Sequence, residues 1–432
     1  MTDIYEIAEY TLKALKNCGA DAAQCIVGRS KKDELNVDGG KFSLMRSTFN
    51  TSISMKAIKD GKKGVTSINQ ATKEAIDEAA AQCIAAAESS VPDEAEQIAP
   101  FTAKAEYKTG VFEPDLNKLF DRIEEFMSQT KKEYPKVILE QLISDYEHSE
   151  KLYMNTNGTS LRYEHGEYSF STMFSAHEGE KASSFNGYFC ALDNLDKPFM
   201  DAGMQRQLLE ESEKQLDTVS PSEKFVGKVI YSPDCFNELL QTALENFASS
   251  GVLIDGTSPW KDALNTKVAS EKLNLRSVPL DGRTVVGQRF TSDGYPAENM
   301  DIIVDGVLKT FILSQYGANK TGFPRALNGG NNLEVLPGDK TLEEMISGID
   351  RGLIVNRFSG GQPSSNGDFS GVAKNSFLIE NGKVSSAVSE TMISGNIIDM
   401  LNNIVAISKE QATDGLSFMP WAEFDGVTVS GK

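Results

Sequence analysis

Residues 218–224 read Thr-Val-Ser-Pro-Ser-Glu-Lys, and they separate two regions of different texture. The stretch is polar, contains a proline and has neither helical nor strand periodicity, which is typical of a link between domains. A chain of 432 residues also exceeds the usual size of one hydrophobic core. The sequence therefore predicts an N-terminal domain over residues 1–218 and a C-terminal domain over residues 225–432.

The region before this link alternates amphipathic helices with predicted strands. Hairpin turns are expected at Asp38-Gly39-Gly40 and at Lys59-Asp60-Gly61-Lys62. Strands of the first half are predicted over 23–29, 33–38, 41–47 and 50–58, between helices that begin after Asp3 and near residue 71. Residues 152–184 align with residues 35–67 at a constant offset of 117, so that hairpins and polar turns fall in step.

This alignment predicts an internal duplication of the N-terminal domain. The two halves, 1–100 and 112–218, would each have the order α-β-β-β-β-α and would share one layered, antiparallel domain. Chance similarity between two hairpin-rich segments is the alternative.

The region after the link is rich in short β-prone runs separated by glycines. Asp305-Gly306 and Asn381-Gly382 are two-residue hairpin signals. Such a pattern predicts a mainly-β sandwich or barrel, and hence an α+β protein overall. Strands are expected at Thr284–Phe290 and in six further runs. Helices are expected at Pro233–Ser249, Thr341–Ser347 and Ser394–Ile407, judged from apolar residues at helical spacing.

Charge and composition exclude several classes of function. The formal net charge is −19 and no basic patch is evident, so neither nucleic acid nor an acidic membrane surface is an expected partner. No apolar run approaches the roughly 18 residues of a membrane span, and residues 1–6 do not begin a signal peptide. The five scattered cysteines include no Cys-x-x-Cys pair. Together these features predict a soluble, cytoplasmic protein.

Metal and phosphate motifs are missing from the sequence. His148, His165 and His177 are the only histidines, and no two of them have a helical ligand spacing. No cysteine follows Cys235, and neither a phosphate-binding loop nor a dinucleotide fingerprint is present. The residues themselves therefore predict no metal site in this chain.

Eight segments in the second half resemble those of one known family, in the family's order. They are Phe290-Thr-Ser-Asp-Gly-Tyr-Pro-Ala297, Ile303-Val-Asp-Gly-Val-Leu308, Asn332-Leu-Glu-Val-Leu-Pro-Gly338, Arg351-Gly-Leu-Ile-Val355, Asn366-Gly-Asp-Phe-Ser370, Phe377-Leu-Ile-Glu-Asn-Gly382, Ile393-Ser-Gly-Asn-Ile-Ile-Asp-Met-Leu401 and Asp425-Gly-Val-Thr-Val-Ser-Gly431. With Asp60-Gly-Lys-Lys-Gly64 near the start, the chain resembles the TldD/PmbA peptidase family, whose members were once described as modulators of DNA gyrase.

The resemblance implies a division of labour. TldD-type subunits bind zinc through His-Glu-x-x-x-His on the helix that opens the C-terminal domain, together with a later cysteine. The matching positions here are Gln241, Thr242 and Asn246. This pattern is that of the TldE/PmbA branch, which has no metal site. The resemblance therefore implies an inactive subunit without cofactor or catalytic residues, paired with a zinc-binding TldD-type chain or with itself, that helps to degrade unfolded peptides.

A candidate cleft follows from the same comparison. Gln241, Thr242 and Asn246 would flank it, and Asp293 would supply a carboxylate on the wall formed by Phe290–Pro296. The alternative for Asp293 is a turn that it sets with Gly294. The alternative function for the whole chain is a stand-alone peptide-binding or scaffold protein without catalytic activity.

Overall fold

The structure is a computed structural model that describes residues 3–221, 223–360, 363–389 and 391–431. Its N-terminal part is a sheet with the strand order β3-β2-β1-β5-β6-β4, to which β7 and β8 add beside β6. Its elements are α1 (Ile4–Asn17), β1 (Ala22–Asp38), β2 (Lys41–Lys59), β3 (Lys62–Ile68), α2 (Lys73–Ser89), β4 (Lys104–Gly110), α3 (Leu116–Glu133), β5 (Val137–Asn155), β6 (Ser160–Glu178), β7 (Lys181–Ala182), β8 (Asn186–Leu192), η1 (Phe199–Asp201) and α4 (Gln205–Lys214).

The strands of this sheet are longer than the sequence predicts. The expected breaks near residues 30–32 and 48–49 are wrong, because β1 and β2 run through both polar stretches without interruption. β1 is hydrogen-bonded to β2 on one side and to β5 on the other, and these two ladders hold a polar segment extended that has little strand propensity of its own. An offset of 117 carries β1 onto residues 139–155, within β5, and β2 onto residues 158–176, mostly within β6.

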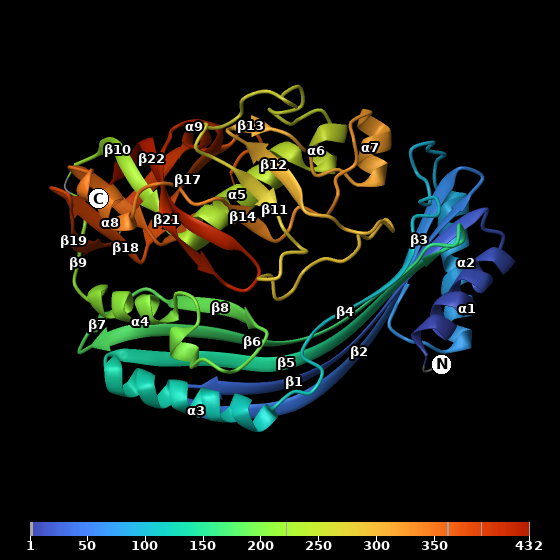
Figure 1. The fold of residues 1–432 in the computed structure, drawn as a ribbon, viewed down its shortest axis with the longest axis horizontal. Helices are drawn as coiled ribbons and strands as arrows, with labels where there is room; N and C mark the ends of the chain where they lie inside the picture. The colour runs from blue at the N-terminus through green and yellow to red at the C-terminus, as the bar shows by residue number, and fades with distance from the viewer. Residues whose placement is uncertain (1–2, 222, 361–362, 390, 432) are drawn as a thin grey trace.

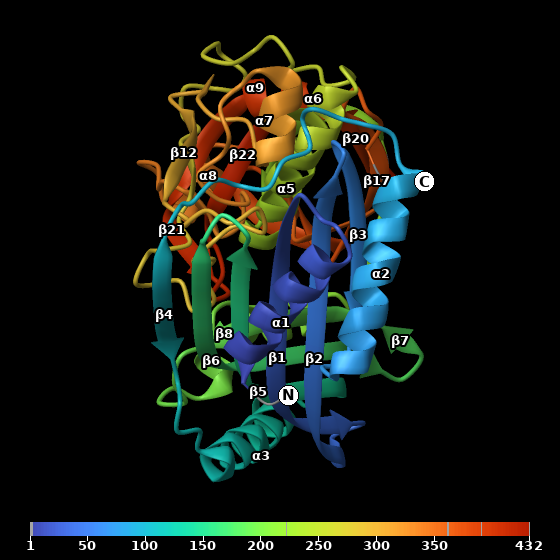
Figure 2. The same ribbon diagram turned by 90° about the vertical axis from the view of Figure 1, so that its right-hand side faces the viewer.

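The long sheet curves around the C-terminal domain. Strands β1, β2, β5 and β6 pass beneath that domain and then rise along its side (Figure 1). Helices α1 and α2 lie on the outer face of the rising part, and α3 lies at the lower end of the sheet (Figure 2). Ala23, Cys25 and Val27 of β1 face α1 and α2, so Gln24, Ile26 and Gly28 face the C-terminal domain. We call the latter face the inner face.

The C-terminal domain is built on one hydrogen-bonded network of 14 strands, and α5 lies in its core. Its elements are β9 (Thr218–Val219), β10 (Phe225–Tyr231), α5 (Pro233–Ala248), α6 (Ser250–Ile254), β11 (Leu275–Ser277), β12 (Met300–Val304), β13 (Val307–Leu308), α7 (Gln315–Thr321), β14 (Leu333–Val335), α8 (Leu342–Ser347), β15 (Arg351–Val355), β16 (Arg357–Gly360), β17 (Asp368–Lys374), β18 (Ser376–Glu380), β19 (Lys383–Val388), β20 (Thr391–Asn396), α9 (Ile397–Asn402), β21 (Ile404–Thr413) and β22 (Phe418–Ser430).

Several predicted elements of this domain differ in the structure. Of the expected run Leu308–Leu313 only Leu308 belongs to a strand, and the expected runs Gly352–Phe358 and Ala373–Glu380 are each divided between two strands. Thr284–Phe290 is a loop with a single bridge at Phe290, not a strand. The predicted helix Ser394–Ile407 is only Ile397–Asn402, because Ile404 onward pairs with β22 as strand β21. The helix expected at Thr341–Ser347 is confirmed as α8, which opens with a capping box formed by Thr341 and Glu344. The α+β class, with an antiparallel layered first domain and a β-rich second one, is confirmed.

The two domains share a hydrophobic core. Phe170, Leu208 and Leu209 of the N-terminal domain belong to the same buried cluster as Ile354 and Phe377 of the C-terminal domain. Such continuous apolar burial favours a fixed arrangement of the domains over free relative motion. No helix within the described residues combines the length and the hydropathy required to cross a membrane.

Glu211 of α4 lies at this interface and should make stability pH-dependent. Its carboxylate accepts hydrogen bonds from Asn356 Nδ2 at 2.6 Å and from Gln207 Nε2 at 2.8 Å, and burial raises its pKa to about 7. The folded chain keeps the proton while the unfolded chain ionises near pH 4.5. The free energy of unfolding of the wild type minus that of Glu211→Gln should therefore fall by about 2 kcal/mol as the pH rises from 4.5 to 7. Urea titrations of both proteins measure this difference, and an equal difference at both ends of that range would contradict it.

Candidate functional site

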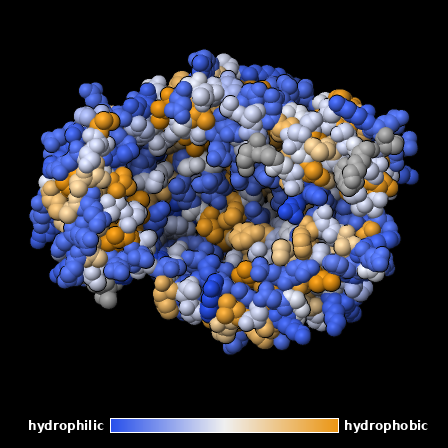
Figure 3. Space-filling view, turned by 180° about the vertical axis from the view of Figure 1, so that it is seen from behind, coloured by the Kyte–Doolittle hydropathy of each residue, from blue (hydrophilic) through white to orange (hydrophobic). Residues whose placement is uncertain are grey.

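A cavity of about 680 Å³ lies between the inner face and the C-terminal domain. The molecule is visibly hollowed between the two domains when seen from behind (Figure 3). Strands β1, β2, β5 and β6 contribute Ile26, Gly28, Arg29, Ser30, Asn50, Ser52, Ser149, Glu150, Lys151 and Tyr163. The C-terminal domain contributes Asn237, Gln241, Val286, Gly287, Gln288, Arg289, Phe290, Asn331, Asn332, Leu333, Asp414, Leu416 and Ser417. We call it the central cavity.

Strand register explains the polar floor of this cavity. Ser52 lies opposite Gly28, Gly28 opposite Lys151, and Lys151 opposite Tyr163, so these four residues form one row across four strands. The next row on the same face contains Asn50, Ser30 and Ser149. Side chains alternate between faces along a strand, which brings these polar groups to the face opposite α1 and α2.

Helix α5 forms one wall of the central cavity. Gln241 Nε2 donates to Asn237 Oδ1 at 3.4 Å, and Asn237 Nδ2 donates to Ser417 Oγ at 3.4 Å. Ser417 Oγ donates in turn to Asp414 Oδ1 at 3.1 Å. The two amides and the hydroxyl of this line offer donors and acceptors to a ligand, and Asp414 at its end is the one member that carries a charge.

The other two predicted positions on α5, Thr242 and Asn246, do not line the central cavity. Thr242 donates its hydroxyl to the Glu238 carbonyl at 2.8 Å and lines a different cavity, of about 390 Å³, although Gln241 also borders that one. Asn246 follows Gln241 by five residues, which places it about 140° further around the helix at 100° per residue. The three residues therefore do not converge on one point.

The residues at these positions do not fit a zinc ion. Gln241, Thr242 and Asn246 supply two amides and a hydroxyl, whereas zinc in proteins takes histidine, cysteine and carboxylate ligands. The hydroxyl is already engaged with the helix backbone. Within residues 3–431, apart from the four undescribed positions among them, no three His, Cys, Asp or Glu side chains gather as ligands for a metal.

Asp293 is placed at the start of α7, outside the central cavity. Gln315 N donates to its Oδ2 at 2.7 Å, and the Thr291 hydroxyl donates to its Oδ1. The carboxylate lines a second inter-domain cavity, of about 360 Å³. Phe290, from the same segment, does line the central cavity with Gln241. Helix α5 and the segment Phe290–Pro296 thus meet at the central cavity, as predicted, but through Phe290. Asp293 lies instead at the N-terminus of α7, where a carboxylate is favourable.

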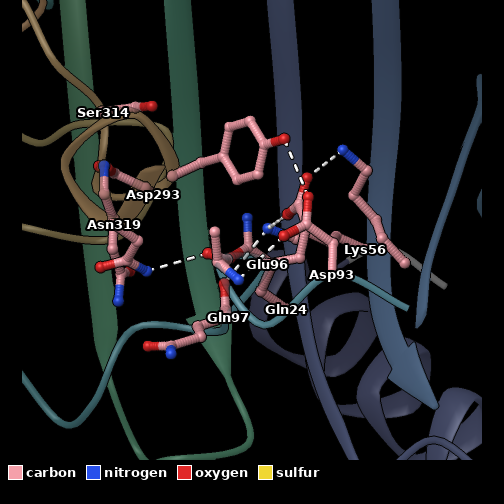
Figure 4. Close-up of polar contacts among 12 residues, drawn as sticks. Gln24, Lys56, Asp93, Glu96, Gln97, Asp293, Ser314 and Asn319 are labelled. Carbon is pink, nitrogen blue, oxygen red and sulfur yellow. Dashed lines mark hydrogen bonds and ion pairs between the residues drawn. The ribbon is translucent and has the colours of Figure 1, made fainter. Parts of the chain in front are cut away.

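The surroundings of Asp293 include a polar contact between the domains, drawn in Figure 4. Residues 91–103, which connect α2 to β4, run beside α7; we call them the latch segment. Asp93 accepts from the Tyr316 hydroxyl at 3.0 Å and pairs with Lys320 at 2.9 Å. Asn319 Nδ2 donates to the Ala95 carbonyl at 2.9 Å. The latch segment therefore ties the N-terminal sheet to the C-terminal domain.

Glu96 anchors the latch segment to the sheet. Its carboxylate pairs with Lys56 at 2.7 Å and with Lys63, and only 5% of its side chain is exposed. Burial alone would raise the pKa of Glu96, but the hydrogen bonds from the two lysines outweigh burial and lower it. The buried acid is therefore ionised and paired under neutral conditions.

Several residues of the central cavity were not predicted from the sequence. Asn237 lies four residues before Gln241, and helical periodicity alone could have placed the two on one face. Lys151 and Arg289 carry no motif, and only the pairing of β5 with β1 and β6 brings Lys151 to this face. The register of three neighbouring strands is a property of the whole fold, and a local sequence pattern does not predict it.

Models of one protein family match most of the chain. Residues 23–87 match the PmbA/TldA metallopeptidase domain 1, residues 107–216 match the central domain, and residues 224–431 match the C-terminal domain. Together these matches extend over both structural domains and leave only short segments unmatched.

Curated relatives carry related names. A metalloprotease of Methanocaldococcus jannaschii is 28% identical over 44% of this chain and 44% of its own length. Metalloprotease PmbA of Escherichia coli O157:H7 is 31% identical over 35% of this chain and 34% of its own. A zinc metalloprotease TldD homolog of Saccharolobus solfataricus is 29% identical over 42% of this chain and 44% of its own. Each alignment thus spans less than half of the relative.

Solved structures share the fold over the whole chain. TldE from Thermococcus kodakarensis superposes with a TM-score of 0.85 at 22% identity, covering 98% of this chain and 100% of that one. A Bacteroides thetaiotaomicron protein described as a modulator of DNA gyrase superposes with a TM-score of 0.83 at 24% identity, covering all of both chains. Three family models in the family's order and this shared fold agree, and the chain belongs to the PmbA/TldD metallopeptidase family.

Proposed function

We propose that this chain is the metal-free subunit of a two-subunit, TldD/TldE-type zinc metallopeptidase that degrades or processes unfolded peptides. The wall that α5 presents to the central cavity carries this proposal. At the positions where a TldD-type subunit has its zinc motif, Gln241, Thr242 and Asn246 supply no metal ligand set. The fold likeness to TldE supports the same assignment.

Under this proposal the chain binds peptide and does not hydrolyse it. The central cavity offers hydroxyls and amides from Ser30, Asn50 and Gln241, and these groups can hydrogen-bond the backbone of an extended peptide. Zinc and the hydrolytic step belong to the partner subunit. The net charge of −19 favours a peptide over nucleic acid as ligand, and five free cysteines support action in the reducing cytoplasm.

Assembly is the direct test of this proposal. The chain and a TldD-type protein from the same genome are purified separately, mixed, and followed by size-exclusion chromatography with light scattering. A defined complex, with peptide turnover that neither protein shows alone, is the expected result. If the two proteins never associate, the partner assignment is wrong.

A stand-alone peptide-binding or scaffold protein is the second candidate. The central cavity is formed wholly within one chain, and this observation favours binding without a partner. A genome that encodes this chain but no His-Glu-x-x-x-His relative would support it. Peptide turnover that depends on a TldD-type partner would rule it out.

A further inference from the structure

Five charged residues line the central cavity among the described parts of the chain: Arg29, Glu150, Lys151, Arg289 and Asp414. Arg29 and Glu150 are direct neighbours across β1 and β5. Glu150 pairs with Arg162 at 2.6 Å, and Arg162 also pairs with Glu106, which accepts from Tyr5 of α1. Their side chains therefore project toward the helix-covered face of the sheet, not into the cavity.

Asp414 does face the central cavity, but its carboxylate is already engaged. The Oδ1 atom accepts hydrogen bonds from Leu416 N at 2.8 Å, from Ser417 N at 2.7 Å and from Ser417 Oγ at 3.1 Å. An oxygen with three donors organises the turn before β22. The carboxylate keeps its negative charge, but it does not act on Lys151, whose pKa is shifted by burial alone.

Lys151 and Arg289 remain as cations that face the cavity without a carboxylate partner among the described residues. Lys151 Nζ stands 5.7 Å from the Phe290 ring centroid, and the Arg289 guanidinium stands 5.9 Å from that of Tyr163. Lys151 and Tyr163 are paired across β5 and β6, and Phe290 follows Arg289 in the chain. The two cations come from different domains and flank the same pair of aromatic rings.

The environment of both cations indicates unused binding capacity. Arg289 Nε is buried and has no hydrogen-bond partner. Burial lowers the pKa of Lys151, and no neighbouring anion opposes this effect. In a chain with a net charge of −19, two cations without a carboxylate partner among the described residues make this part of the cavity locally positive. Lys151 is exposed and Arg289 is half-buried, so an anion from solvent can reach both cations, and the recess concentrates their attraction for it.

We propose that the central cavity binds a carboxylate of an extended peptide between Lys151 and Arg289, as the group that orients the peptide. This inference rests on the proposed function only in taking a peptide as ligand. The carboxylate is either the C-terminal group or an Asp or Glu side chain, and both present the same two oxygens to a guanidinium and an ammonium. A volume of about 680 Å³ is sufficient for a short segment of such a peptide.

The wild-type chain alone tests the proposal. Three fluorescent hexapeptides, blocked at the N-terminus and otherwise uncharged, are compared by fluorescence anisotropy: one with a free C-terminal carboxylate, one amidated, and one amidated with a central glutamate. At least one acidic peptide should bind about tenfold more tightly than the neutral amide. Tight binding of the first alone assigns the terminus, and tight binding of the third assigns a side chain. Equal affinity of all three, or no binding by any, overturns the proposal.

Variants locate the site. Lys151→Gln and Arg289→Gln should each weaken binding of the acidic peptide about tenfold and leave that of the neutral amide unchanged. Lys13→Gln, an exposed position on α1, makes the same charge change away from the cavity and should have no effect. Thermal unfolding verifies that each variant is folded. Unchanged affinity in both cavity variants refutes the assignment. None of these measurements requires a partner subunit, so they can be interpreted even if the assembly test fails.

Discussion

Replacing Gly294 with alanine is expected to lower the free energy of unfolding by about 3 to 4 kcal/mol. Gly294 has φ +90°, and a Cβ built on it would come within 2.3 Å of the Tyr153 ring. Tyr153 is fully buried where the inner face meets Phe290. The added methyl group therefore combines a left-handed backbone conformation with overpacking of a ring that has no space to move.

A second glycine separates these two costs. Gly322 ends α7 with φ +77°, and no atom lies within 4 Å of its hypothetical Cβ. Gly322→Ala should therefore cost only the backbone term, about 1 kcal/mol. Urea unfolding of both variants gives the comparison. Equal losses would show that Gly294 is not packed against Tyr153 and that the domains dock differently.

Glu96→Gln is expected to cost about 3 kcal/mol at pH 7. The substitution keeps the shape of the side chain but removes the anion between Lys56 and Lys63, leaving two cations close to an uncharged amide. Because the ion pairs of Glu96 with Lys56 and Lys63 anchor the latch segment, amide hydrogens in residues 91–103 should also exchange faster in the variant. Hydrogen exchange followed by mass spectrometry reports this local opening.

The neighbouring Glu94 provides the matched control. It is exposed, and Glu94→Gln should change neither stability nor exchange. The pKa of Glu96 is lowered in the folded state, so its contribution is present above the ordinary value of 4.5 and is lost as pH falls through the folded-state pKa. The difference between wild type and Glu96→Gln should thus narrow in acid. A difference that does not depend on pH would contradict the ion-pair explanation.

Much of the fold follows from local patterns in the sequence. The helix expected after Asp3 is α1, and the helix expected at Thr341–Ser347 is α8. Patterns fail where pairing overrides propensity. Residues 30–32 look like a break in β1, but two flanking ladders keep them extended. Ile404 looks helical by spacing, yet its partner in β22 makes it a strand.

The candidate site shows the same limit at the level of side chains. Gln241 and Phe290 were expected near one cleft, and both border the central cavity. Asp293 carries equal weight in the sequence pattern, but it lies at the N-terminus of α7 and borders a different cavity. Lys151 becomes a candidate only when β5 is set in register with its neighbours. Whether Gln241, Thr242, Asn246 and Asp293 take part in function stays a prediction.

Under the proposed function, two features of the structure suit this chain to binding a peptide. The central cavity combines a polar floor from the curved sheet with an amide-lined wall from α5. The latch segment and the shared core hold the two domains around this cavity. Under the proposed function, a fixed cavity of this kind would order a flexible peptide, while the partner subunit supplies the metal.

Zinc content measured together with peptide turnover tests the central claim most directly. The purified chain, a TldD-type partner, and their complex are each analysed by plasma mass spectrometry and assayed on an unfolded peptide with and without a chelator. The account predicts no tightly bound zinc and no turnover for this chain alone, and chelator-sensitive turnover with zinc supplied by the partner in the complex. One tightly bound zinc per chain in this protein alone, with chelator-sensitive hydrolysis, would contradict it.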